Sequence, residues 1–336
     1  MFYIGWTMTG NMMVDRADHT ASLLPDGNVL ITGGSSRSYG TLNSVELYDP
    51  TTGACRRMKN MINRRSGHTA SVLSNGKVLV TGGSNSKSAE LYDFSTDIWT
   101  MTINMNYARQ GHTASLLPNG KVLVAGGDGL KTAELYDPTT GIWIRTGNMS
   151  VARKYHTASM LLNGKVLVAG GYDTRDRFGS AELYDSLTGT WAMTGKMNVA
   201  RERHTASILS NGKVLIAGGI KDGAYLNNCE LFDPLADRWT NTGSMHTARA
   251  YHTASELFDG TVLVTGSYNH YSSLNSSELY DPATGNWIKA RNMKVIRLLH
   301  TASVLLNGTV LVTGGLDFSN IDGLKSAELY GSMSSI

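Results

Sequence analysis

HTASMLLNGKVLVAGGYDTRDRFGSAELYDSLTGTW, residues 156–191, is the stretch that decides the fold. Copies of it fill the chain, and the histidine that opens each copy lies at His19, His68, His112, His156, His204, His252 and His300. The intervals between these histidines are 49, 44, 44, 48, 48 and 48 residues. A period of this size indicates a repeat architecture with one supersecondary unit per copy.

Each copy contains four short runs that are typical of β-strands. In the quoted copy they are HTASMLL, KVLVAGG, AELYD and the run around Trp191. An Asn-Gly or Asp-Gly pair separates the first two runs, which predicts a tight hairpin with positive φ at both central residues. These pairs begin at Asp26, Asn75, Asn119, Asn163, Asn211, Asp259 and Asn307. Four antiparallel strands per copy, repeated radially, describe a blade of a β-propeller.

The motif resembles the kelch repeat. The residues that carry the resemblance are Gly170-Gly171, then Tyr184, then Trp191 seven positions later. The same spacing joins Tyr92 to Trp99, Tyr136 to Trp143, Phe232 to Trp239 and Tyr280 to Trp287. Copy one has Cys55 in place of the tryptophan, and copy six has Gly266-Ser267 in place of the glycine pair. The resemblance implies an all-β, seven-bladed kelch β-propeller, a fold that hosts many functions.

The two ends of the chain complement each other. Trp6 lies 13 residues before His19, as Trp99 lies 13 before His112, whereas no tryptophan follows Tyr330. The N-terminal strand is therefore expected to complete the last blade beside 327–329 and close the ring. We expect one domain, 1–336, with blades at 16–60, 65–104, 109–148, 153–196, 201–244 and 249–292, and with blade 7 made from 297–331 and 1–10.

Composition limits the partners and the compartment. The net charge of +3 argues against a nucleic-acid ligand held by phosphate contacts. No apolar run approaches a membrane span and no signal peptide is visible, so a cytoplasmic monomer without membrane attachment is expected. Cys55 and Cys229 fall in different blades, which argues against a disulfide between them. We expect no cofactor and no metal.

Residues present in every copy are interpreted as structural. In blade 4 they are Arg153, His156 and Glu182, together with Tyr184 and Trp191, which recur in nearly every copy. The seven histidines are expected to hydrogen-bond within their own blades, and the methionine seven residues before each is expected to pack. Each arginine is expected to form a buried ion pair with the glutamate of the third strand. The pairs join Arg16, Arg65, Arg109, Arg153, Arg201, Arg249 and Arg297 to Glu46, Glu90, Glu134, Glu182, Glu230, Glu278 and Glu328.

Residues that vary between copies are the candidates for a site. They lie in the dipeptide between arginine and histidine and in the loop from the glycine pair to the third strand, which alternating strands place at one end of the propeller. The loop is shortest in blades 2 and 3, and elsewhere it carries Tyr and Arg, which are enriched at binding surfaces. The predicted ligand-binding residues are Asp18, Lys154, Tyr155, Tyr172, Arg175, Arg177, Glu202, Arg203, Tyr251, His270, Tyr271 and Leu299. Glu256, where other copies have an apolar residue, is expected to be drift rather than a catalytic acid.

Two functions are consistent with such a surface. The first is a non-catalytic binding module for a protein segment or a glycan. The second is a sugar-directed small-molecule enzyme, isomerase or oxidase-like, whose site at the channel mouth uses Tyr155, Tyr251, Glu202 and Arg203. Tyr155-His156 and Tyr251-His252 are similar to the Tyr-His pair of the kelch-type copper radical oxidases. In that resemblance a cysteine should precede each pair by one blade, but Gly111 and Arg203 stand there, so the cross-linked cofactor is not expected.

Overall fold

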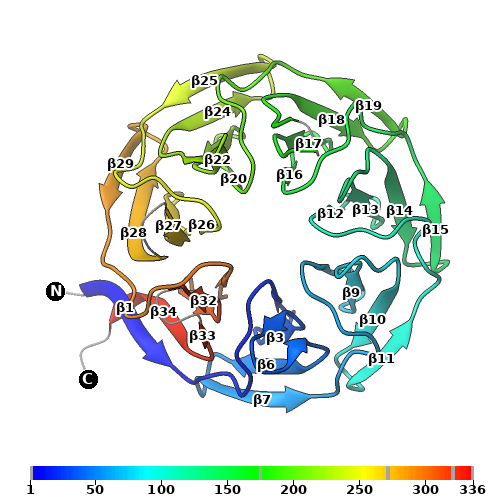
Figure 1. Ribbon diagram of the computed structural model, residues 1–336, viewed down its shortest axis with the longest axis vertical. Coiled ribbons are helices and arrows are strands. Elements are labelled where there is room, and N and C mark those ends of the chain that lie inside the picture. The colour runs from blue at the N-terminus through cyan, green and yellow to red at the C-terminus, as the bar shows by residue number, and fades with distance from the viewer. Residues whose placement is uncertain (1–2, 174–175, 270–272, 319–321, 334–336) are drawn as a thin grey trace. The chain divides into compact units, whose positions relative to one another are not determined.

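The structure, a computed structural model, describes residues 3–173, 176–269, 273–318 and 322–333. They form seven four-stranded antiparallel sheets, and some of the sheets also carry a two-stranded ribbon (Figure 1). The chain divides into two compact units. The four-blade unit is Gly67–Thr242 and contains blades 2 to 5, and the three-blade unit is Met1–Ser66 with Gly243–Ile336 and contains blades 6, 7 and 1. The predicted seven-bladed β-propeller fold is confirmed, while the prediction of a single domain stays a prediction.

In the four-blade unit each sheet follows chain order from its innermost to its outermost strand. Blade 2 contains β8 (Thr69–Val72), β9 (Val78–Thr81), β10 (Ala89–Asp93) and β11 (Ile98–Met101). Blade 3 contains β12 (Thr113–Leu116), β13 (Val122–Ala125), β14 (Ala133–Asp137) and β15 (Ile142–Arg145). Blade 4 contains β16 (Thr157–Met160), β17 (Val166–Ala169), β18 (Ala181–Asp185) and β19 (Thr190–Met193). Blade 5 contains β20 (Thr205–Ile208), β21 (Val214–Ala217), β24 (Cys229–Asp233) and β25 (Arg238–Thr242).

In the three-blade unit the order is the same except in blade 7, which both ends of the chain build. Blade 6 contains β26 (Thr253–Glu256), β27 (Val262–Tyr268), β28 (Ser273–Asp281) and β29 (Asn286–Lys289). Blade 7 contains β30 (Thr301–Val304), β31 (Val310–Thr313), β34 (Ala327–Met333) and β1 (Tyr3–Thr9). Blade 1 contains β2 (Thr20–Leu23), β3 (Val29–Thr32), β6 (Val45–Asp49) and β7 (Ala54–Met58).

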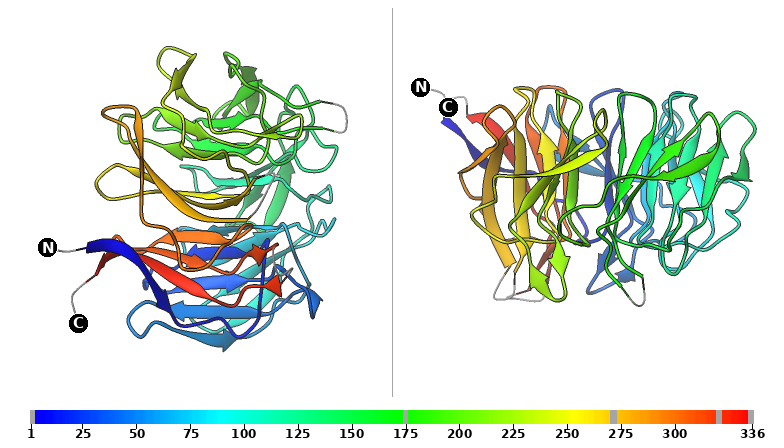
Figure 2. Two further views of the ribbon diagram at one scale, coloured as in Figure 1. Left: turned by 60° about the vertical axis from the view of Figure 1, so that its left-hand side comes forward. Right: turned by 90° about the horizontal axis from the view of Figure 1, so that it is seen from above.

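The N-terminal strand completes the C-terminal blade, as the sequence predicts. β1 pairs antiparallel with β34 from Tyr3 opposite Met333 to Thr9 opposite Ala327 (Figure 2). Trp6 takes the place of the missing tryptophan: its ring lies 5.1 Å from that of Tyr330, and its Nε1 donates to the carbonyl of Arg291 at 2.8 Å. The two ends of the chain are thus joined by backbone pairing and by a buried indole.

The hairpin between the first two strands differs from the predicted two-residue turn. In blade 4 Leu161 N donates to the carbonyl of Lys165, and Gly164 N donates back to the carbonyl of Leu161. Only the glycine has positive φ, 80° at Gly164, and Asn163 instead accepts a bond from the backbone N–H of Lys165 at 3.1 Å. The asparagine therefore stabilises the loop through its side chain, in the manner of an Asx turn.

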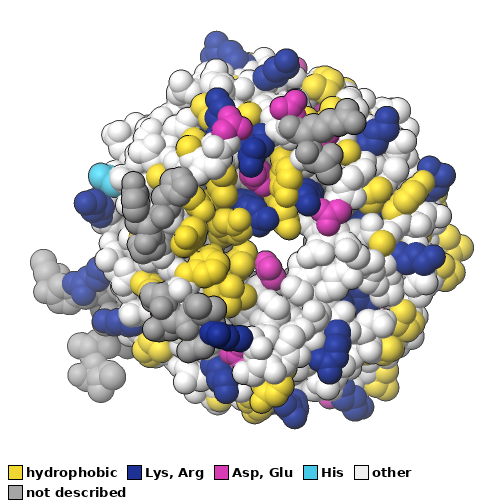
Figure 3. All heavy atoms as spheres, viewed as in Figure 1, with side chains coloured by type: hydrophobic (Ala, Val, Ile, Leu, Met, Phe, Trp, Pro, Cys, Tyr) yellow, Lys and Arg dark blue, Asp and Glu magenta, His cyan; other side chains and the backbone are white. Residues whose placement is uncertain are grey.

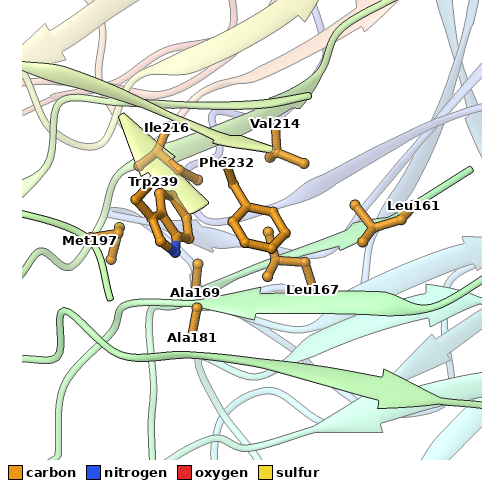
Figure 4. Packing of buried hydrophobic residues seen from close by; sticks show 9 residues of the cluster. All are labelled: Leu161, Leu167, Ala169, Ala181, Met197, Val214, Ile216, Phe232 and Trp239. Atoms are coloured by element: carbon orange, nitrogen blue, oxygen red, sulfur yellow. The ribbon is translucent and has the colours of Figure 1, made fainter. Parts of the chain in front are cut away.

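The core lies between neighbouring blades. The first four residues of the second strand are buried in every blade, as in β17, which explains the apolar sequence of this strand. Figure 4 shows one such cluster, in which residues of blade 4 such as Leu167 and Ala181 pack against Ile216, Phe232 and Trp239 of blade 5. Trp239 Nε1 donates to the carbonyl of Gly195 at 2.8 Å. The repeated tryptophan thus anchors one blade to the connection that precedes it.

Six of the seven predicted arginine–glutamate pairs are seen within the two units, and each is buried. Their guanidinium–carboxylate distances run from 2.7 to 2.9 Å. In blade 4 Arg153 donates to the carbonyls of Gly170 and Ser180 and to Glu182. Glu182 also accepts the backbone N–H of Ser150, which lies in the connection from blade 3. Each pair therefore fixes the glycine bend and the incoming connection at once. Arg65 and Glu90 belong to different units.

Five of the repeated histidines bond through Nε2 to the preceding blade, whereas the sequence predicted bonds within their own blade. His156 Nε2 lies 3.0 Å from Thr113 Oγ1 of blade 3, and His204 Nε2 lies 3.0 Å from Thr157 Oγ1 of blade 4. In the three-blade unit His300 meets Thr253 and His19 meets Thr301 in the same way. The position at the start of the innermost strand brings the ring against the preceding blade, which sequence spacing alone does not reveal.

The loops after the glycine pairs differ as their lengths suggest. In blades 1, 5 and 7 they fold into ribbons formed by β4 (Ser35–Ser36) with β5 (Gly40–Thr41), β22 (Ile220–Lys221) with β23 (Ala224–Tyr225), and β32 (Leu316–Asp317) with β33 (Asp322–Gly323). In blade 6, β27 and β28 simply extend, with a bulge between Thr265 and Ser267. In blades 2 and 3 the loops are tight turns. No helix long and apolar enough to cross a bilayer occurs in the described residues.

Candidate functional site

The residue before each repeated histidine adopts the same unusual backbone conformation. It has positive φ at Asp18, Tyr155, Arg203, Tyr251 and Leu299, between 51° and 55°, and blades 2 and 3 have glycines there, Gly67 and Gly111. A left-handed conformation costs a residue with a Cβ of the order of 1 kcal/mol or more, and such strain gathers at functional sites. Five blades therefore carry side chains where glycine would be easier to accommodate.

Backbone bonds fix these positions from one blade to the next. In the four-blade unit Tyr155 N donates to the carbonyl of Gly111 at 2.9 Å, and Arg203 N donates to the carbonyl of Tyr155 at 3.1 Å. In the three-blade unit Leu299 N donates to the carbonyl of Tyr251, and Asp18 N donates to the carbonyl of Leu299, both at 3.2 Å. Side chains at successive positions are thus held beside one another although they lie about one repeat apart in sequence.

Six of the predicted residues form one group in the four-blade unit, which we call the Tyr155 cluster: Lys154, Tyr155, Tyr172, Arg177, Glu202 and Arg203. The guanidinium of Arg203 lies 3.5 Å from the centre of the Tyr155 ring. The Tyr155 and Tyr172 rings stack with centres 5.9 Å apart and an interplanar angle of 26°. The ammonium of Lys154 lies 4.9 Å from the centre of the Tyr172 ring. The two stacked rings are therefore flanked by cations.

Carboxylates hold the cations of the Tyr155 cluster in place. Glu202, only 4% exposed, accepts a 2.9 Å bond from Arg177 Nε and lies 3.7 Å from Arg203 Nε. Arg177 also lies 3.5 Å from Asp222, and Lys154 lies 2.5 Å from Asp128. Three basic and three acidic groups thus meet here. Figure 3 shows basic, acidic and apolar side chains interleaved over β16, β20 and β22.

The electrostatics of Lys154 agree with this pairing. Partial burial alone would lower the pKa of the Lys154 ammonium. Its hydrogen bonds to Asp128 and to Tyr172 outweigh burial, and the pKa is raised above its usual value. Lys154 is therefore a fixed cation rather than a candidate base. Its backbone is fixed too, because it exchanges two hydrogen bonds with Tyr172, at 2.9 and 3.0 Å.

The other predicted site residues lie elsewhere. Asp18, Tyr251 and Leu299 belong to the three-blade unit, where they share the backbone bonds described above. Arg175, His270 and Tyr271 lie outside the described residues. Glu256 is exposed at the end of β26, and partial desolvation raises its pKa.

Asp128 and Asp222 contact residues of the Tyr155 cluster, but they were not predicted from the sequence. Each lies in the loop after a glycine pair, in blades 3 and 5 respectively. Their role depends on Lys154 and Arg177, which come from the neighbouring blade 4. The available signal was an acidic residue in a loop next to a blade with basic residues. That signal is weak, because acidic residues are common in exposed loops.

The described residues contain no group of three or more His, Cys, Asp or Glu side chains arranged to hold a metal ion. Both cysteines are free, and burial raises the pKa of the Cys55 thiol to about 12. Cys55 stands where the other blades have tryptophan, and its Sγ lies 4.0 Å from the carbonyl of Gly10. Trp191 and Trp239 reach the carbonyls of Gly147 and Gly195 from the matching positions. The position of Cys55 is thus explained by packing.

Comparison with protein-family models shows which family these repeats belong to. A model described as the KLHDC2/KLHL20/DRC7 Kelch-repeats domain matches residues 67–244 and 111–315, and a Kelch motif model matches residues 18–62. The chain belongs to the kelch-repeat β-propeller family. This kelch chain has no match among curated protein sequences. Membership explains the glycine pair and the tyrosine–tryptophan spacing, and it leaves the function open.

A solved structure similar to this kelch chain is a fungal alcohol oxidase of the AA5 family in complex with copper. The TM-score is 0.80 at 19% identity, over 98% of this chain and 76% of the oxidase chain. At that identity the likeness concerns the fold alone. In this kelch chain Gly111 carries no side chain and Arg203 lies over the Tyr155 ring. Neither position offers a cysteine sulfur for a thioether cross-link.

Proposed function

We propose that this kelch propeller is a non-catalytic binding module that recognises a protein segment or a glycan through the Tyr155 cluster. The observation that carries the proposal is the stack in which Arg203 lies 3.5 Å from the Tyr155 ring and Tyr155 stacks on Tyr172. Tyr and Arg are the residues most enriched at binding hot spots. Here they occupy a surface that the fold holds rigid.

The pairing within the cluster supports recognition in particular. Glu202, Asp222 and Asp128 fix the three cations before any ligand arrives, which lowers the entropic cost of binding. The exposed fraction of Arg203 and Arg177 side chains is 21% and 33%, so part of each guanidinium still faces outward. Such groups offer planar hydrogen-bond donors beside tyrosine rings, a combination suited to peptide carbonyls and to sugar hydroxyls.

The balance of charge narrows the ligand class. Three carboxylates accompany the three cations, so the cluster as a whole carries no excess charge. Charge balance favours an uncharged polar ligand over a polyanion. A neutral oligosaccharide or an uncharged loop of a protein fits this requirement.

The same cluster offers less support for a sugar-directed enzyme. A general acid or base must reach a substrate atom with its own proton or lone pair. Glu202 is almost completely buried, and its two oxygens face Arg177 and Arg203. The carboxylate therefore positions the guanidinium groups and is not presented for proton transfer.

The experiment uses residues that the chain already has at the same repeat position. Tyr155→Gly and Arg203→Gly each copy Gly67 and Gly111, whose backbone is the same. The full chain and the double variant are screened on a glycan array and in peptide pull-downs. We expect a ligand that binds the full chain and is lost in a folded double variant. A ligand retained by the double variant, or turnover of a sugar without such binding, contradicts the proposal.

A further inference from the structure

A second candidate site lies in blade 1, within the three-blade unit, and shares no residue with the Tyr155 cluster. It is a pocket of about 340 Å³ lined by Met13, Val14, Tyr39, Leu42, Ser44, Arg57 and Arg64. Three segments build it: the connection from β1 to β2, the β4–β5 ribbon with the residues that lead from it to β6, and β7 with the residues that follow it. Two of its seven lining residues are arginines, and none is acidic.

The two guanidinium groups have no carboxylate partner among the described residues. Arg64 donates one bond, 2.8 Å, to the carbonyl of Thr41, and no ion pair within 4.0 Å is formed by either Arg57 or Arg64 in the described part of the chain. Arg57 lies opposite Glu46 in the strand register. The Glu46 carboxylate, however, already accepts bonds from Arg16 and from the N–H groups of Met13 and Val14.

The repeats show that this pair of cations is not required by the blade. The register places Met8, Met101 and Met193 where blade 1 has Arg57. Ala108, Ala152, Ala200 and Ala248 precede the repeated arginines where blade 1 has Arg64. Blade 3 has Arg145 at the first position but Ala152 at the second. Both arginines and the Tyr39 ribbon therefore come together in blade 1 without a structural need.

The chemistry of the lining indicates the ligand. Two arginines without counterions match the charge of about −1.5 to −2 on a phosphomonoester at neutral pH, and the planar guanidinium binds its oxygens in pairs. The Ser44 hydroxyl is a further donor. Met13, Val14 and Leu42 give an apolar wall, and the exposed Tyr39 ring stands at the rim. An inorganic ion would leave that wall uncovered.

We propose that this pocket binds a phosphomonoester carried on an apolar or aromatic group, between Arg57 and Arg64. The ester could come from a phosphorylated protein side chain or from a small molecule, and both present the same chemistry. The site is independent of the Tyr155 cluster, because it shares no residue with it. Failure of one proposal therefore leaves the other standing.

The test is a calorimetric titration of the full chain at low ionic strength. The ligands are phenyl phosphate, inorganic phosphate, phenylacetate and a short peptide with one phosphotyrosine between alanines. We expect saturable binding of phenyl phosphate, at least tenfold tighter than that of inorganic phosphate or phenylacetate. If the peptide binds more tightly than phenyl phosphate, the natural ester is on a protein side chain. If it binds no better than phenyl phosphate, the natural ester is a small molecule. Both results support the site.

Substitutions taken from the other blades test the residues. Arg57→Met and Arg64→Ala should each weaken phenyl phosphate binding at least tenfold while the thermal midpoint stays unchanged. Arg145→Met, the same change in blade 3, should leave the affinity unaltered. Absence of saturable binding, equal affinity for inorganic phosphate or phenylacetate, or binding that survives both substitutions would overturn the proposal.

Discussion

The guanidinium of Arg203 lies 3.5 Å from the centre of the Tyr155 ring, although 48 residues separate them in the chain. The two residues occupy the same repeat position in adjacent blades, and both have positive φ. A contact between equivalent positions is a consequence of the repeat, since each blade presents this residue beside the next. The ring and the cation would not meet if either blade had glycine there.

Removing the Tyr155 ring should change stability very little. Tyr155→Gly loses a cation–π contact of about 0.5–2 kcal/mol and relieves a left-handed strain of similar size. We expect the free energy of unfolding to stay within about 1 kcal/mol of that of the parent chain, by urea denaturation. A loss well above this range would mean that the ring is part of the core rather than of a recognition surface.

Breaking a repeated ion pair should destabilise the protein strongly. Arg153→Met leaves the Glu182 carboxylate buried without its cation and removes two bonds to backbone carbonyls. We expect a loss of about 3–5 kcal/mol in the free energy of unfolding. The matched control is Lys165→Ala, which breaks the exposed pair with Asp185 at 3.3 Å and should have no measurable effect. Equal effects of the two changes would show that the buried pair is dispensable.

Stability should fall as the pH falls below about 6.5, the ordinary histidine pKa. Burial, followed by the charge of a nearby arginine, lowers the pKa of His112, His204 and His300 to about 3 in the folded protein. Unfolded chains therefore bind more protons than folded ones between about pH 6.5 and 3. Each such histidine should reduce the free energy of unfolding by about 1.4 kcal/mol per pH unit across that window.

Urea midpoints measured at pH 7.5, 6.0 and 5.0 test this dependence. The midpoint should be constant above pH 7 and should decrease steadily below pH 6. In a His204→Asn variant the slope below pH 6 should be shallower by about one proton. A midpoint that does not change between pH 7.5 and 5.0 would contradict the burial of neutral histidines.

Loss of the N-terminal strand should open blade 7. Trp6 is 1% exposed and packs with Tyr330, Val310 and Met293. Trp6→Ala should cost about 3–5 kcal/mol, as truncation of a buried aromatic residue does, and deletion of residues 1–10 should lower the thermal midpoint further. Ile4→Ala on the same strand, where the side chain is 56% exposed, is the control and should be nearly neutral. A deletion variant with an unchanged midpoint would rule out the strand as a closure.

The repeat made most of the fold predictable. The glycine pair, the tyrosine and the tryptophan recur in register. The sequence therefore indicates four strands per blade, and it indicates that the N-terminal strand with Trp6 completes blade 7. The arginine–glutamate pairs were predictable for the same reason. The spacing of residues in the sequence does not reveal which residue a side chain contacts in the neighbouring blade. His156 meets Thr113 of the preceding blade, and this contact depends on how blades pack rather than on a local pattern.

The site was predictable only as a set of positions. The residues that vary at one end of the repeat include Tyr155, Tyr172, Glu202 and Arg203, and the structure brings these four together. Their role in binding stays a prediction. The acidic partners Asp128 and Asp222 were not found, since exposed loops contain many such residues. The pocket around Arg57 and Arg64 was not predicted, because three separate segments contribute only two or three residues each.

The backbone bond from Arg203 N to the carbonyl of Tyr155, like that from Tyr155 N to Gly111, needs no particular side chain. A mutation at either position therefore alters what the surface presents without altering how the blades are joined. The residue before each histidine can change by single substitutions, one blade at a time, while the scaffold stays intact. Such positions suit the diversification of binding specificity, whether by natural selection or in a library randomised at Tyr155 and Arg203.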